Sequence, residues 1–201
     1  MTGFLWISVI VAVAIPLVTR GSYSTLVLHT RWEWSSLFAG GVLLAAVCEH
    51  LPVPGGFDLG FGALVASYAL LLAFCGRNIA RPGMAVLLIG LAANAAAVTV
   101  NHGMPVHQPA KWIAGGGITV TVWHHPNDSS THLYWLGDVI YLPRLDEVIS
   151  FGDLIIAMGL ADLAYEGSRR RRRWRFTTLE SEGDHVDREA AAADRYRRAI
   201  A

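Results

Sequence analysis

Long uncharged apolar runs alternate with short arginine-bearing breaks along most of the chain. A helix needs about 20 apolar residues, within a range of about 17 to 25, to cross the hydrocarbon core of a bilayer. Four runs approach that length and a fifth is interrupted by two aspartates; they cover residues 4–19, 34–48, 59–76, 82–100 and 148–165. The pattern predicts an all-α integral membrane protein, built as a bundle of five transmembrane helices.

The arginines in the breaks predict how this bundle is oriented. Cytoplasmic loops of membrane proteins carry an excess of Lys and Arg. The breaks after the first and third runs contain arginine pairs, and a run of arginines at 169–173 follows the fifth. Five spans place all three on one side. We therefore expect a multi-pass protein of the bacterial plasma membrane, with its amino terminus outside and its carboxy terminus in the cytoplasm.

The outer segment 101–151 is long for a loop and rich in aromatic residues, so we expect a small folded extracytoplasmic cap. Alternating β-branched residues at 118–123, a polar turn at 126–130 and residues 131–136 predict a β-hairpin within it. The expected organisation is a membrane domain at 1–166 that includes this cap, followed by a basic cytoplasmic tail at 167–201. The tail is expected to be partly disordered, with a short helix at 187–200.

Polar residues within the apolar pattern are the candidate functional groups. Asn94 lies among alanines in the fourth run, where an amide must find a partner because lipid offers none. An interhelical hydrogen bond is the simpler reading, and a place on a solute pathway is the alternative. Asn101 directly follows the same run, and Asp162 lies near the far end of the fifth.

Two further aspartates, Asp138 and Asp153, approach the start of the fifth run from the outer segment. Asp153 follows Ser150 at the spacing of a capping box, which would begin the fifth helix. Each carboxylate would then accept backbone amides, Asp138 in a turn and Asp153 at the helix start. Alternatively, the two form a cation or proton site at the membrane surface.

Three histidines flank the polar turn: His124, His125 and His132. A hairpin would bring them together as candidate ligands for zinc or copper. However, adjacent histidines in a strand point to opposite faces, and no recognised metal-binding spacing accompanies them. A solvated polar turn is therefore the preferred interpretation, and no cofactor is predicted.

Three short motifs give a resemblance. Residues 101–105 read Asn-His-Gly-Met-Pro, residues 136–140 read Leu-Gly-Asp-Val-Ile, and residues 150–153 read Ser-Phe-Gly-Asp. They resemble an uncharacterised family of small bacterial polytopic membrane proteins, commonly actinobacterial, that is catalogued as a domain of unknown function. The resemblance covers about residues 1 to 166 and implies no activity. The chain departs from the family pattern at Tyr141, where the family commonly has proline.

The sequence favours a non-catalytic binding or structural protein of the cell envelope, which would recognise an envelope component or protein partner through the cap. A solute or ion carrier is the alternative, and a membrane-embedded enzyme is the second; no nucleophile, phosphate-binding or dinucleotide motif identifies catalytic residues. We expect anionic lipids at the cytoplasmic face to bind the arginine run, which comprises Arg169, Arg170, Arg171, Arg172 and Arg173. Nucleic acid is not an expected partner.

Overall fold

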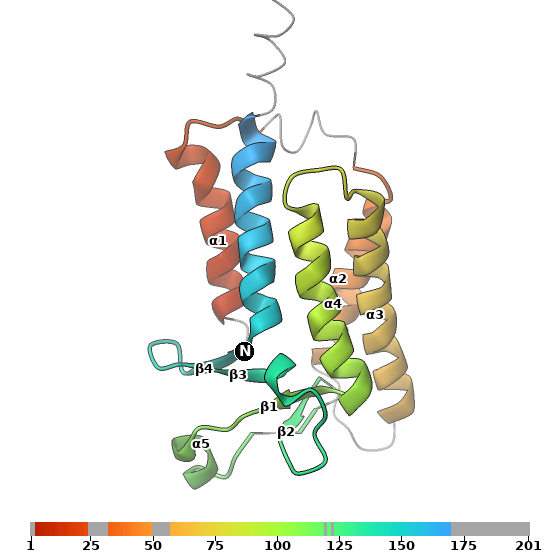
Figure 1. Ribbon diagram of the computed structural model, residues 1–201, viewed down its shortest axis with the longest axis vertical. Coiled ribbons are helices and arrows are strands. Elements are labelled where there is room, and N and C mark those ends of the chain that lie inside the picture. Colours follow the sequence, from red (N-terminus) through yellow and green to blue (C-terminus); the bar gives the residue numbers. More distant parts are fainter. Residues whose placement is uncertain (1–2, 24–31, 50–56, 119, 122, 170–201) are drawn as a thin grey trace, which may run out of the picture.

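The computed structural model describes residues 3–23, 32–49, 57–118, 120–121 and 123–169. Five helices run side by side, and a sheet and a short helix lie at one end of them (Figure 1). The long helices are α1 (Gly3–Val18), α2 (Ser35–Glu49), α3 (Phe57–Arg77), α4 (Met84–Asn101) and the helix at 151–169. The short elements of the sheet end include α5 (Ala110–Ala114) and the 3-10 turn η2 (Tyr134–Leu136). The predicted tail helix at 187–200 lies outside the described residues.

The prediction of an all-α bundle of five transmembrane helices is wrong. Two of the described helices are long and apolar enough to cross a membrane, over Leu59–Arg77 and Met84–Asn101. The helices α1 and α2 are apolar but have only 16 and 15 residues. The helix at 151–169 carries three acids, Asp153, Asp162 and Glu166. Strands are also present, so the fold is not all-α.

The four strands form one mixed sheet in the order β2-β1-β3-β4. They are β1 (Met104–Val106), β2 (His124–Pro126), β3 (Asp138–Leu142) and β4 (Glu147–Ser150). The central β1 is parallel to both β2 and β3, while β3 and β4 are antiparallel. β1 starts directly after α4, and β4 leads directly into the helix at 151–169, so the sheet joins two helices that lie side by side (Figure 1).

The predicted hairpin across the polar turn is wrong as well. β2 begins where the alternating run ends, and it pairs with β1 rather than with residues 131–136. The side chain of Asn101 explains the difference, because it accepts the backbone N–H of His132 and donates to its carbonyl, both at 2.8 Å. These bonds hold the backbone of His132 beside the end of α4, so that residues 131–136 do not run alongside residues 118–123 as a hairpin would require.

The helix at 151–169 packs very closely on α4 through glycines. A Cβ atom added at Gly90 would lie 2.8 Å from the carbonyl oxygen of Gly152, and one added at Gly159 would lie 2.8 Å from the backbone nitrogen of Leu87. Gly83 and Gly90 are seven residues apart, as are Gly152 and Gly159. This spacing keeps Gly152 and Gly159 on one helix face, and Gly83 immediately precedes α4; small residues at such positions let two backbones approach.

Arginine and tryptophan gather at the end of the helices opposite the sheet. Arg77 forms an ion pair with Glu33 at 2.7 Å, and the Arg81 Nε donates to Asn78 Oδ1 at 2.8 Å. The guanidinium groups of these arginines lie 5.5 and 5.0 Å from the ring centres of Trp34 and Trp32, respectively. An arginine within about 6 Å of a ring centre is attracted by the negative face of the ring, so these contacts hold the two arginines against the tryptophans.

Candidate functional site

One face of the sheet brings polar side chains together against the helices. Met104 pairs with His124, Val106 pairs with Asp138, and Asp138 in turn pairs with Ser150. Directly paired residues point to the same face of a sheet, and so do residues two apart in a strand. Met104 packs into the buried cluster of α3 and α4, so this is the face toward the helices. His124, Asp138 and Ser150 therefore form a polar row beneath the helix ends.

The centre of this row is the pair Asp138 and His124. The His124 Nε2 lies 3.7 Å from Asp138 Oδ2, and the two side chains are only 14% and 3% exposed. Burial raises the pKa of the Asp138 carboxyl well above its usual range, and the nearby Asp153 raises it further. Burial also lowers the pKa of His124 to about 3. The expected turn role of Asp138 is thus wrong, because it is a buried residue at the start of β3.

Asn94 links α4 to the start of the helix at 151–169. Its Nδ2 donates to Asp153 Oδ1 at 2.8 Å, and its Oδ1 accepts the hydroxyl of Ser150 at 2.9 Å. The predicted capping box is confirmed, since the backbone N–H of Ser150 donates to Asp153 Oδ2 and that of Asp153 donates to Ser150 Oγ, each at 3.0 Å. Asn94 therefore makes the interhelical hydrogen bond that its position suggested.

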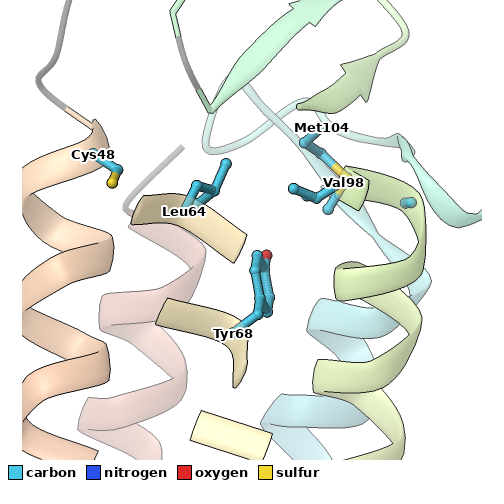
Figure 2. Close-up of a cluster of buried hydrophobic side chains, with 6 residues drawn as sticks. Cys48, Leu64, Tyr68, Val98 and Met104 are labelled. Carbon is cyan, nitrogen blue, oxygen red and sulfur yellow. The ribbon is translucent and has the colours of Figure 1, made fainter. Parts of the chain in front are cut away.

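Tyr68 approaches the same region from α3. Its side chain is 6% exposed and lies in the cluster that contains Leu64, Val98 and Met104. Figure 2 shows the ring between α3 and α4, with its hydroxyl toward the end where Met104 enters. The ring of Trp123, which precedes β2, lies 6.0 Å away. The apolar cluster thus covers the polar row from the helix side.

Two other acidic residues at this end, Glu147 and Asp146, accept hydrogen bonds from distant parts of the chain. Glu147 accepts the backbone N–H groups of Gly3 and Phe4, each at 2.8 Å, at the start of α1. Burial alone would raise the pKa of Glu147, but these hydrogen bonds prevail and the pKa is lowered. Asp146 accepts the indole N–H of Trp112 at 2.7 Å and the hydroxyl of Tyr141 at 3.1 Å.

The three candidate metal ligands do not converge. His124 faces the helices, whereas the His125 Nδ1 lies 3.0 Å from the carbonyl oxygen of Pro126, and His132 is exposed in the loop held by Asn101. Within the described part of the chain, no group of three or more histidine, cysteine or acidic side chains is arranged to hold a metal ion. The hypothesis of a metal site across the turn has no support in this geometry.

The remaining predicted residues lie away from the polar row. Asp162 is exposed on the helix at 151–169. Arg169 donates to the Tyr165 hydroxyl at 2.9 Å and to the carbonyl oxygen of Thr19 at 3.1 Å, which joins that helix to the end of α1. Residues Arg170, Arg171, Arg172 and Arg173 lie outside the described residues.

Sequence reasoning missed Tyr68 and Glu147 as parts of this end of the molecule. Neither belongs to a local motif, because each finds its partners through tertiary contacts more than fifty residues away in sequence. The close packing of α4 on the helix at 151–169 did have a signal in the sequence, namely two pairs of glycines at the same seven-residue spacing. No sequence signal indicated the approach of His124 to Asp138, since it depends on the order of the strands in the sheet.

Comparison with family models gives one finding, a match over residues 29–165 to a family described as "Family of unknown function (DUF5317)". Comparison with curated proteins and with solved structures finds no match. The match covers α2, α3, α4, the sheet and most of the last described helix, and so includes all of the polar row. The chain belongs to this family of unknown function.

Proposed function

We propose that the protein is an integral membrane protein whose helices α3 and α4 cross the bilayer, with the sheet end outside the cell and the arginine end in the cytoplasm. At a rise of 1.5 Å per residue, the 21 and 18 residues of these helices span about 31 and 27 Å. That length suits a hydrocarbon core of about 30 Å.

The exposed surface of the helices is the observation that carries this proposal. Only 33% of the apolar stretch of each of α3 and α4 is buried, whereas the core helix of a soluble protein would be mostly buried. Large apolar side chains also face outward from the neighbouring helices, such as Ile10 at 63%, Leu43 at 66% and Met158 at 67%. A soluble monomer rarely leaves so much contiguous apolar surface in water.

The arginines support the proposed orientation. Of the arginines in the described ranges, Arg20, Arg77, Arg81 and Arg169 lie at the ends of helices away from the sheet, and Arg144 lies between β3 and β4. An excess of arginine on one side favours the cytoplasm for that side. The same end would meet anionic lipid headgroups.

For the biochemical role, we propose a non-catalytic binding or structural protein of the bacterial envelope that uses its sheet end. Trp135 and Tyr134 are 61% and 44% exposed in η2. This turn is held by backbone bonds and by the adjacent bonds between Asn101 and His132. Rigidly presented Trp and Tyr side chains are typical anchors of protein interfaces.

A photoreactive phenylalanine analogue placed at Trp135, irradiated in intact cells, tests this role. We expect one discrete adduct with a protein or envelope polymer. The control is the same analogue at Ile89, which is 59% exposed on α4 and should contact lipid. If both positions yield lipid adducts alone, the binding role is wrong and the aromatic residues of η2 are an interfacial belt.

A carrier is the second candidate, and the buried polar row is the observation that favours it, because polar groups buried next to spanning helices often line a solute pathway. Purified protein in proteoliposomes would be assayed for uptake of ions and small solutes. An Asn94→Leu variant should abolish uptake if Asn94 lies on the pathway. Uptake that is unchanged in this variant would count against the carrier.

A further inference from the structure

We propose that Asp138 and His124 form a proton-binding site beneath the helix ends, in which Asp138 holds the proton and His124 is neutral. This site goes beyond the proposed binding role. It does not depend on which partner the sheet end meets or on how the protein is oriented.

The arrangement of charges around Asp138 is the first argument. Asp153 is fixed by the capping box and by Asn94, and it is close enough to act electrostatically on Asp138. A buried carboxyl group beside a second carboxylate does not readily ionise unless a cation compensates the charge. The described arginines near the helices lie at the opposite end, so no described arginine lies beside Asp138; the charge of the amino terminus favours its ionised form but does not prevail over burial and Asp153. A retained proton removes the repulsion.

The other ionisable groups near the pair also favour a protonated Asp138 and a neutral His124. From α3, Tyr68 contributes a buried phenol rather than a cation. On β2, the next residue is His125, which points to the opposite face of the strand; a positive charge on it would disfavour one on His124. Because the His124 side chain is only 14% exposed, an imidazolium there would lose most of its water, so the neutral ring is the form that fits. The pair therefore contains one acid hydrogen and one basic nitrogen 3.7 Å away from the carboxyl oxygen.

Infrared spectroscopy of the purified protein in lipid nanodiscs tests the site directly. The carbonyl stretch of a protonated carboxylic acid is separate from that of a carboxylate, so we expect this band at pH 7 in the wild-type protein. It should disappear in Asp138→Asn and persist in Asp162→Asn, the matched control with an exposed aspartate. If the wild-type protein has no such band at pH 7, or if Asp138→Asn retains it, the proposal is wrong.

The stability of Asp138→Asn gives an independent readout. A carboxyl whose pKa is raised on folding stabilises the fold fully below its unfolded pKa and loses that contribution as pH rises toward the folded value. Above the pKa of unfolded histidine, about 6.5, and below the pKa of folded Asp138, the unfolding equilibrium constant of the wild type should rise by up to about tenfold per pH unit. Asp138→Asn should lack this rise and should fold at pH 7, because an amide resembles the neutral acid in shape. A variant much less stable than the wild type at pH 7 would indicate an ionised Asp138 and overturn the assignment.

Discussion

A methyl group added at Gly90 should separate the two helices that carry the polar row. Gly90→Ala places a Cβ 2.8 Å from the carbonyl oxygen of Gly152 and 2.9 Å from the backbone nitrogen of Ile156. Real Cβ atoms do not approach backbone atoms that closely, and backbone cannot rotate away as a side chain can. The helix at 151–169 must therefore move away from α4.

The size of the effect follows from two opposing contributions. Inserting a methyl group into a tightly packed contact costs about 1–3 kcal/mol. Replacing glycine by alanine within a helix returns up to about 1 kcal/mol. With the full offset, a net loss of up to about 2 kcal/mol remains, and at about 2–4 °C per kcal/mol it lowers the thermal midpoint by up to about 8 °C.

Gly62→Ala on α3 is the matched control, since a Cβ there meets nothing within 4 Å. Both variants would be purified in the same detergent, and their unfolding would be followed by intrinsic tryptophan fluorescence during heating. We expect Gly90→Ala to melt below the wild type and Gly62→Ala to melt at or above it. Equal midpoints for the two variants would show that the close contact between α4 and the helix at 151–169 does not exist.

Three further predictions concern the hydrogen bonds of the sheet end. Asn94→Leu leaves the Asp153 carboxylate without its amide donor and should cost about 1.5–3 kcal/mol; an unchanged thermal midpoint in detergent would contradict this role. Asn101→Ala frees the backbone of His132, so limited proteolysis should cut near that residue faster than in the wild type, and an unaltered cleavage pattern would refute the clamp. Folding lowers the pKa of Glu147, so its contribution to the stability of the fold is present above pH 4.5 and is lost as pH falls. Glu147→Gln should therefore be about 1 kcal/mol less stable than the wild type at pH 7 and equally stable at low pH, and a deficit that is the same at all pH values would contradict the carboxylate's role.

The helices could be predicted from the sequence because their signals are local. The apolar runs at 4–19, 34–48, 59–76 and 82–100 agree closely with α1 to α4, and the motif of Ser150 and Asp153 marks the start of the last described helix. Such signals require only neighbouring residues along one helix. The number of long helices was predicted correctly, but five helices are not five membrane spans, since two of them are too short and one carries three acids.

The sheet could not be predicted in the same way. Its strands have three to five residues, too few for a clear alternation of apolar and polar positions. β1 pairs in parallel with two strands that come much later in the chain, and parallel pairing has no local turn to indicate it. For this reason the sequence suggested a hairpin around His124 and His132, and the approach of His124 to Asp138 across β1 was unforeseen.

Cysteine labelling in intact cells tests directly whether α3 and α4 cross the membrane with the sheet end outside and the arginine end in the cytoplasm. Single cysteines would be introduced as Arg144→Cys at the sheet end and Ile79→Cys between α3 and α4, with Cys48 and Cys75 replaced by alanine. Intact cells would be treated with a membrane-impermeant maleimide. We expect the protein to remain in the membrane fraction after alkaline extraction, with Arg144→Cys labelled from outside and Ile79→Cys labelled only after permeabilisation. Extraction of the protein into the soluble fraction, or labelling of both cysteines from the same side, would contradict the account.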